Sequence, residues 1–236
     1  MPAHTSVARR FQLFDQTVTT MAEQLQPVRA PAQMLRALGW GMDTLEATLA
    51  TTSARTRAKI ACHAGCDACC SVPVDAQAHD VFFAAHHIQL NFSPVALTDV
   101  LARIEAHRAR VTAFAVGARA TSRQPCALLA AGSCTIYDGR PKPCRTHHSS
   151  DAAVCAANQA DPRVDVSKVY VPALRARLFA VMLGLDEAIE AVGYDERCYD
   201  FGSALHVALT DSFSLLRWMR RGEAFPDSCL AAREPI

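Results

Sequence analysis

Residues 62–70 read Cys62-His63-Ala64-Gly65-Cys66-Asp67-Ala68-Cys69-Cys70. Two- and three-residue gaps between cysteines let one tight loop direct several thiolates at a single ion, and such spacings recur in zinc and iron–sulfur sites. Gly65 supplies the conformational freedom that this loop needs. Cysteines scattered by chance do not produce this spacing, so the stretch predicts a metal site around which the neighbouring chain is organised.

A second group of cysteines follows this loop, so that eight of the ten cysteines lie within residues 62–155. We predict that one metal centre takes all eight thiols: Cys62, Cys66, Cys69, Cys70, Cys126, Cys134, Cys144 and Cys155. Side chains of adjacent residues point apart in an extended backbone. Cys69 and Cys70 therefore either serve different metals, or one ligates while the other packs or bridges. Eight thiolates can fill two tetrahedral sites or one four-thiolate cluster with spares, and the cofactor is either zinc or an iron–sulfur cluster.

Other residues near the cysteines give less specific signals. His63, His147 and His148 are either additional metal ligands or polar loop residues. Cys198 is a candidate late ligand, and Cys229 is expected to be a bystander near the C-terminus. The basic residues Arg140, Lys142 and Arg145 either donate hydrogen bonds to sulfur, which would offset the negative charge of a thiolate site, or are solvated loop charges. His107 is expected in the core. No residue pattern predicts catalytic side chains.

Composition limits the classes of protein to which the chain can belong. It has 236 residues, of which 50% are hydrophobic and 20% charged, with a formal net charge of +1. These values are typical of a folded globular protein and give no global attraction to nucleic acid or to an anionic membrane. The N-terminus has no charged segment followed by an apolar one, so we expect no secretory signal and a reducing cytoplasmic location. In that compartment clustered cysteines bind metal more often than they form structural disulfides.

Apolar periodicity predicts a mainly α-helical protein outside the cysteines. We expect helices over about residues 7–25, 33–60, 75–91, 94–114, 167–192 and 203–221, with Gly193 as a helix C-cap. A short β-hairpin is expected from residues 126–129 and 134–137. The predicted architecture is one domain over 1–236: a helical bundle with an irregular cysteine-rich insert at 62–155 and a loose tail over 226–236.

These motifs together resemble a known family, the YkgJ-like cysteine-cluster proteins, which are named for a C-x-x-C-x-x-C-C cluster and chelate zinc or iron. The resemblance rests on residues 62–70, on Pro125-Cys126-Ala127-Leu128, and on the spacing from Cys134 through Arg140-Pro141 to Cys144-Arg145. This chain differs in its first gap, which is three residues long instead of two. The flanking helices lie outside the resemblance.

The resemblance implies metal chelation more directly than it implies a reaction. Some relatives are similar to flagellin lysine N-methylases, in which an iron–sulfur centre is implicated. Three functions are therefore carried forward: a metal-chelating protein, an iron–sulfur-dependent modifying enzyme, and a structural or adaptor protein whose metal only stabilises the fold. The expected partner is a metal ion or cluster, with a protein substrate or partner left open. No membrane or nucleic-acid partner is expected.

Overall fold

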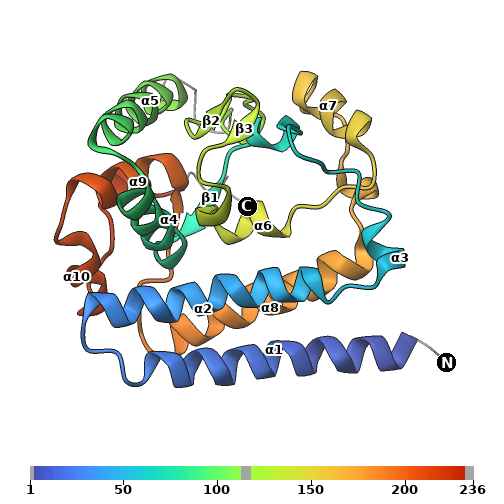
Figure 1. Ribbon diagram of the computed structural model, residues 1–236, viewed down its shortest axis with the longest axis horizontal. Coiled ribbons are helices and arrows are strands. Elements are labelled where there is room, and N and C mark those ends of the chain that lie inside the picture. The colour runs from blue at the N-terminus through green and yellow to red at the C-terminus, as the bar shows by residue number, and fades with distance from the viewer. Residues whose placement is uncertain (1–2, 113–117, 232–236) are drawn as a thin grey trace.

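The computed structural model describes residues 3–112 and 118–231 and consists mainly of α-helices (Figure 1). The helices are α1 (Ala3–Leu25), α2 (Pro31–Ala50), α3 (Ala54–Arg57), α4 (Ala78–Asn91), α5 (Pro94–Thr112), α6 (Lys142–Thr146), α7 (Ala152–Ala160), α8 (Pro172–Ala191), α9 (Phe201–Thr210) and α10 (Ser214–Met219). Short 3-10 turns are η1 (Ala68–Ser71), η2 (Tyr137–Gly139), η3 (Ser167–Val169) and η4 (Asp227–Cys229). The predicted fold class, mainly α with a short hairpin, is confirmed. No helix of this described part is long and apolar enough to cross a bilayer.

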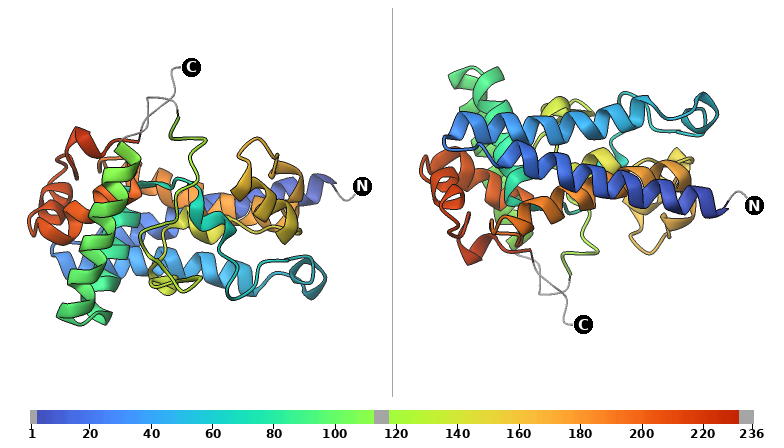
Figure 2. Two further views of the ribbon diagram at one scale, coloured as in Figure 1. Left: turned by 90° about the horizontal axis from the view of Figure 1, so that it is seen from above. Right: turned by 90° about the horizontal axis from the view of Figure 1, so that it is seen from below.

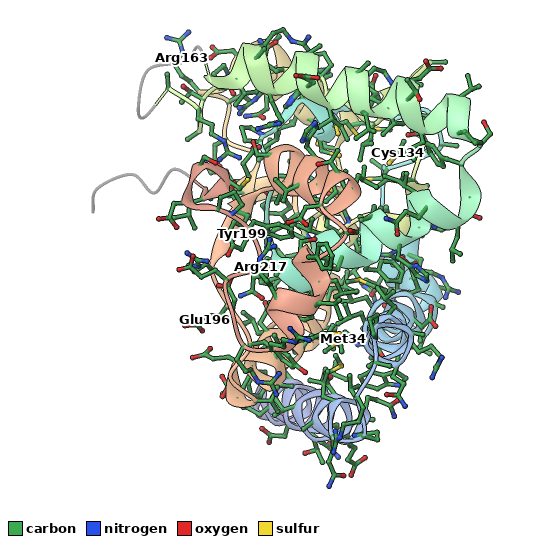
Figure 3. All side chains as sticks on the ribbon, turned by 90° about the vertical axis from the view of Figure 1, so that its left-hand side faces the viewer. Met34, Cys134, Arg163, Glu196, Tyr199 and Arg217 are labelled. Atoms are coloured by element: carbon green, nitrogen blue, oxygen red, sulfur yellow. The ribbon has the colours of Figure 1, made fainter. Side chains whose placement is uncertain are left out.

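The long helices α1, α2 and α8 run side by side and form the base of the molecule (Figures 1 and 2). The apolar stripe predicted for α8 faces inward, because Leu174, Leu178 and Leu185 are all buried. Gly184 permits the close contact between α8 and α1, since a Cβ atom there would lie 2.9 Å from the Phe14 carbonyl oxygen. The buried apolar side chains of the long helices form one connected core, in which Met34, labelled in Figure 3, is fully buried.

The cysteine-bearing segments lie on one side of this base, where η1, α6, α7 and a hairpin surround the centre of Figure 1. The hairpin pairs β2 (Leu129–Ala130) with β3 (Ser133–Cys134) and is shorter than expected. Its turn places Ala131 at φ 48° and Gly132 at φ 71°. Both residues therefore adopt the left-handed conformation that is typical of tight hairpin turns.

A second pair of strands was not predicted from the sequence. β1 (Asp75–Gln77) pairs antiparallel with β4 (Cys198–Asp200), with Gln77 opposite Cys198. Residues 75–77 were expected to open the following helix, which instead begins at Ala78. The two strands are short and more than 100 residues apart, so local sequence patterns do not predict their pairing.

Several expected helices end earlier or divide. The helix expected over 33–60 ends at Ala50, where the hydroxyl groups of Thr51 and Thr52 donate to backbone carbonyls and Ser53 caps the separate helix α3. The helix expected over 203–221 is interrupted after Thr210, and the carboxylate of Asp211 accepts a hydrogen bond from the amide of Phe213. Gly193 has φ 77° and follows the end of α8, as predicted.

The stretch expected to be a loose tail is held against the fold as far as residue 231. Cys229 is 1% exposed, and the amide of Ala231 donates to the carbonyl of Cys198 at 3.0 Å. An isolated bridge also joins Leu230 to Tyr199. Residues 113–117, including the predicted helical Phe114, and residues 232–236 lie outside the described ranges.

A buried lysine attaches the Cys144 segment to the helical base. The ammonium group of Lys142 donates to Oδ2 of Asp80 at 2.7 Å and lies 2.9 Å from Oδ1 of Asp186; it also contacts Nε2 of His79. The backbone amide of Lys142 donates to the other oxygen of Asp80 at 2.8 Å. The exposed fractions of Lys142 and Asp80 are 2% and 1%. Helices α4 and α8 therefore hold the segment through a desolvated ion cluster.

A second ionic contact joins the same segment to α2. Arg140 and Arg145 both donate to Oε1 of Glu46, at 3.1 and 2.6 Å. The Arg145 guanidinium also donates to the carbonyls of Arg140 and Asp138. The three basic residues of this segment are thus buried and bonded mainly to carboxylates and carbonyls, which neither sequence-based alternative anticipated.

The Lys142 cluster makes a prediction about stability in acid. Burial alone would raise the pKa of Asp186, but Lys142 and the hydrogen bond from His79 lower it to about 2. A carboxylate with a lowered pKa stabilises the fold above about pH 4 and loses that contribution as the pH falls towards 2. We expect Asp186→Asn to reduce the free energy of unfolding by about 2 kcal/mol at pH 7, with a difference that shrinks between pH 4 and pH 2. Urea unfolding followed by circular dichroism measures both quantities.

Glu187→Gln is the matched control, because Glu187 is the exposed neighbour on the same helix. Its free energy of unfolding should stay within about 0.5 kcal/mol of the original protein. An Asp186→Asn protein as stable as this control at pH 7 would contradict the stabilising role of the cluster.

Candidate metal centre

The first cysteine loop is shaped by local hydrogen bonds and one glycine. Gly65 has φ 83°, a conformation that other residues adopt at a cost. The amide of Cys66 closes a turn onto the carbonyl of His63 at 3.0 Å. The amide of Cys70 bonds to the carbonyl of Asp67 at 2.8 Å and starts the turn η1. Cys69 and Cys70 therefore lie on a tight 3-10 turn instead of an extended backbone.

Backbone hydrogen bonds bring the later segments to this loop. The amide of Cys126 donates to the carbonyl of Cys70 at 2.8 Å, and the amide of Gln124 donates to the carbonyl of Ser71 at 3.1 Å. At the other end of the loop, the amide of Ala61 donates to the carbonyl of Ser149 at 2.8 Å. Helix α7, which carries Cys155, packs against η1.

Electrostatic coupling relates the predicted thiols in two sets of three, called arms below, with the adjacent pair Cys69 and Cys70 coupled to both. In the first arm, Cys62 is electrostatically coupled to Cys66 and Cys155, and also to Cys69. Desolvation is the main cause that raises the pKa of Cys62, and these neighbouring thiols add to it, whereas a backbone hydrogen bond at Ser149 opposes them.

The second arm consists of Cys126, Cys134 and Cys144. The Cys144 side chain is accessible to solvent, yet protein surrounds it sufficiently that desolvation raises its pKa, and the thiols of Cys126, Cys69 and Cys134 raise it further. Desolvation also raises the pKa values of Cys126 and Cys134. Arg140 lowers the pKa of Cys134 and of Cys144, so its charge acts on this arm although its hydrogen bonds go elsewhere.

The central pair is Cys69 and Cys70. A hydrogen bond between their thiols is the largest cause that raises the pKa of Cys69, followed by desolvation. Cys69 is coupled to Cys62 in the first arm and to Cys134 and Cys144 in the second. This residue therefore lies where the two arms meet.

Backbone amides already point at the sulfur atoms of both arms. The amide of Ser149 donates to Cys62 Sγ at 3.4 Å, and the amide of Leu128 donates to Cys126 Sγ at 3.5 Å. A backbone hydrogen bond from Ile136 similarly lowers the pKa of Cys134. Amide donors of this kind stabilise negative charge on sulfur in metal-bound thiolates. The donor set is thus soft, rich in thiols and partly prepared for negative charge, which fits zinc or an iron–sulfur cluster.

The described thiols do not surround a common position as ligands of one metal ion would. Within residues 3–112 and 118–231 no three His, Cys, Asp or Glu side chains converge enough to enclose a metal ion. All ten cysteines are free thiols, so no disulfide competes for them. The eight predicted ligands come from five segments, and their side chains would have to move to complete a shell.

The remaining candidate ligands lie apart from the arms or at their edge. Cys198 is in β4, and Cys229 is buried in the core as a small apolar residue. His63 is exposed and contacts the carbonyl of Ala64. His147 stacks edge-on against Tyr170, with ring centroids 5.2 Å apart.

A hollow of about 380 Å³ adjoins the first arm. Cys69, Cys155 and His147 all contribute to its wall, together with Arg123 and Asn158. The first arm is therefore reached from solvent, whereas Cys126 faces a different and mostly apolar pocket between α5 and α9.

Sequence reasoning missed the acidic residues that hold the site in place. The carboxylates of Glu46, Asp80 and Asp186 form ion pairs with basic side chains of residues 140–145. Spacing could not identify the pairing of Asp186 with Lys142, because the two residues are 44 positions apart.

Comparison with known proteins agrees with the donor set. Residues 61–163 match the family model CxxCxxCC, described as "Putative zinc- or iron-chelating domain". No curated protein and no solved structure matches the chain. The match includes all eight cysteines of the two arms and the central pair, and it supports a metal-binding role. Residues 61–163 are thus similar to the CxxCxxCC family, in agreement with the resemblance in the cysteine motifs.

Proposed function

We propose that the protein chelates zinc or an iron–sulfur cluster through Cys62, Cys66, Cys69, Cys70, Cys126, Cys134, Cys144 and Cys155. The observation that carries the proposal is the meeting of two three-thiol arms at Cys69 and Cys70, with backbone amides directed at sulfur in each arm. Thiols gathered in this way raise one another's pKa when no cation is present. A bound metal would relieve that repulsion and favour the thiolates.

The electrostatics near the arms suit a negatively charged centre. Four thiolates around Zn²⁺, or around a [4Fe–4S]²⁺ core, carry a net charge of about −2. Arg140 lowers the pKa of two thiols in the second arm, and its own guanidinium is fixed by Glu46 and by the carbonyl of Tyr137. A fixed cation of this kind offsets thiolate charge without occupying the coordination sphere.

Chelation would also connect segments that are far apart in the sequence. The eight cysteines come from the 62–70 loop, the segment at 126, β3, α6 and α7. A metal bound in the folded state and absent from the unfolded state adds its binding free energy to stability. The long helices of the base contribute to the apolar core. We propose that metal loss loosens the cysteine segments while the base stays folded.

Metal content of the purified protein tests the proposed chelation. Protein purified without oxygen should contain stoichiometric metal, either as zinc in a colourless sample or as iron with acid-labile sulfide in a brown one. Elemental analysis, sulfide assay and the visible spectrum distinguish these results. A folded protein that contains neither metal and whose eight thiols react freely with a thiol reagent would contradict the proposal.

Serine variants of single cysteines test the position of Cys69 between the arms. Cys69→Ser should lower metal content more than Cys62→Ser, because Cys69 adjoins both arms and Cys62 only one. Elemental analysis of each variant, normalised to protein concentration, measures the difference.

Cys229→Ala is the matched control, since Cys229 is buried in the apolar core away from both arms. It should keep the metal content of the original protein. If Cys69→Ser retained full metal, or if Cys229→Ala lost as much as Cys69→Ser, the proposed ligand set would be wrong. Circular dichroism checks that every variant keeps its helices.

A further inference from the structure

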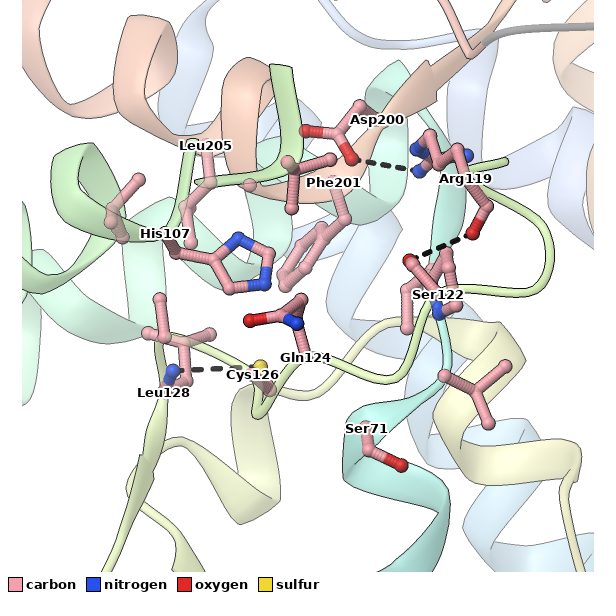
Figure 4. A pocket seen from close by; sticks show the side chains of 17 residues that line it. Ser71, His107, Arg119, Ser122, Gln124, Cys126, Leu128, Asp200, Phe201 and Leu205 are labelled. Atoms are coloured by element: carbon pink, nitrogen blue, oxygen red, sulfur yellow. Dashed lines mark hydrogen bonds and ion pairs between the residues drawn. The ribbon is translucent and has the colours of Figure 1, made fainter. Parts of the chain in front are cut away.

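A second pocket lies between α5, α9 and the segments around residues 71–74 and 119–128 (Figure 4). Its walls are mainly apolar and include Val74, Ile104, Phe201 and Leu205. The enclosed part has a volume of about 40 Å³, enough for a few water-sized groups. Cys126 of the second arm forms part of the wall, so a molecule in this pocket would lie beside the proposed metal centre.

Three polar groups in the pocket have hydrogen-bonding capacity to spare. The structure gives no partner to the His107 imidazole or to the Gln124 carboxamide among the residues it describes. In Figure 4 the carboxamide lies between His107 and the Cys126 thiol, and all three line the pocket. The third group is Nε of Arg119, which is buried without a hydrogen-bond partner in the described part of the chain. His107 was expected in the core, but it is half-buried and faces this pocket.

The charge of the pocket favours an uncharged ligand. Arg119 is the one cation among its described lining residues, and it is bonded to both Asp75 and Asp200 at 2.7 Å. One guanidinium with two carboxylates carries a net charge of −1, so no positive charge is left for an anion. Burial lowers the pKa of His107, although Asp200 opposes this, so the ring is neutral near pH 7.

The spare groups also define the hydrogen bonds that a ligand would make. Arg119 Nε can only donate, whereas Gln124 and a neutral His107 can each donate and accept. A carbonyl oxygen can accept from one of these donors, and an amide N–H can donate to an acceptor on Gln124 or His107. The apolar walls suit a short aliphatic group attached to that carbonyl.

We propose that this pocket binds the uncharged amide end of a small aliphatic ligand next to Cys126. The inference goes beyond metal chelation and does not depend on it, because none of the three polar groups is a proposed metal ligand. It assigns a ligand site beside Cys126, in a pocket separate from the hollow at Cys69 and Cys155.

Propionamide and propionate test the proposal, because they have the same shape and differ in charge. Saturation-transfer NMR on the protein as purified measures the affinity of each. Propionamide should bind with a dissociation constant of about millimolar order, as expected for so small a molecule. Propionate should bind at least about tenfold more weakly, because the one guanidinium of the pocket is already paired with two carboxylates.

Gln124→Leu keeps the size of the side chain and removes its hydrogen bonds. It should weaken propionamide binding about fivefold. Gln89→Leu is the matched control, because Gln89 is exposed on α4 and lines no described pocket, and it should bind as the original protein does. Equal binding of the two probes, no propionamide binding, or an unchanged affinity in Gln124→Leu would overturn the proposal. None of these readouts depends on whether metal is bound.

Discussion

The placement of the Cys144 segment depends on one buried lysine, Lys142. Lys142, two residues before Cys144, is held by ion pairs with Asp80 on α4 and Asp186 on α8. Removing one partner from such a desolvated cluster costs stability, so the cluster favours one position of the segment on the helical base. Glu46 adds a second attachment through Arg140 and Arg145. The helices thus determine where Cys144 lies before any metal is considered.

Backbone hydrogen bonds join the cysteine segments to one another. Cys70 and Cys126 are joined through their backbones, Ala61 is joined to Ser149, and the hairpin pairs Cys134 with Leu129. These bonds bring sulfur atoms from distant segments to neighbouring positions without closing a coordination shell. A centre of this kind combines a rigid support with ligands that can still adjust, and we propose that metal binding completes it.

The sequence was sufficient for the features that local spacing encodes. The 62–70 motif and the Cys134–Cys144 block predicted the family match of residues 61–163, and apolar periodicity predicted the buried stripe of α8. Features that depend on distant partners were missed. They are the pairing of β1 with β4, the anchoring of Lys142 by Asp80 and Asp186, and the pocket at His107. Each joins residues far apart in the chain, and a single sequence does not show which distant residues meet. The helix breaks at Thr51 and Asp211 were missed because short polar side chains compete with the helical backbone there, and apolar periodicity does not record this competition.

The central claim is that sulfur atoms of these cysteines bind the metal, and X-ray absorption at the metal edge tests it most directly. For protein purified without oxygen, the account predicts a first coordination shell dominated by sulfur, at about 2.3 Å for zinc. An iron–sulfur cluster would show the sulfur shell together with a neighbouring iron. A first shell made mainly of nitrogen or oxygen would contradict the account, because the metal would then be held by residues other than the eight cysteines.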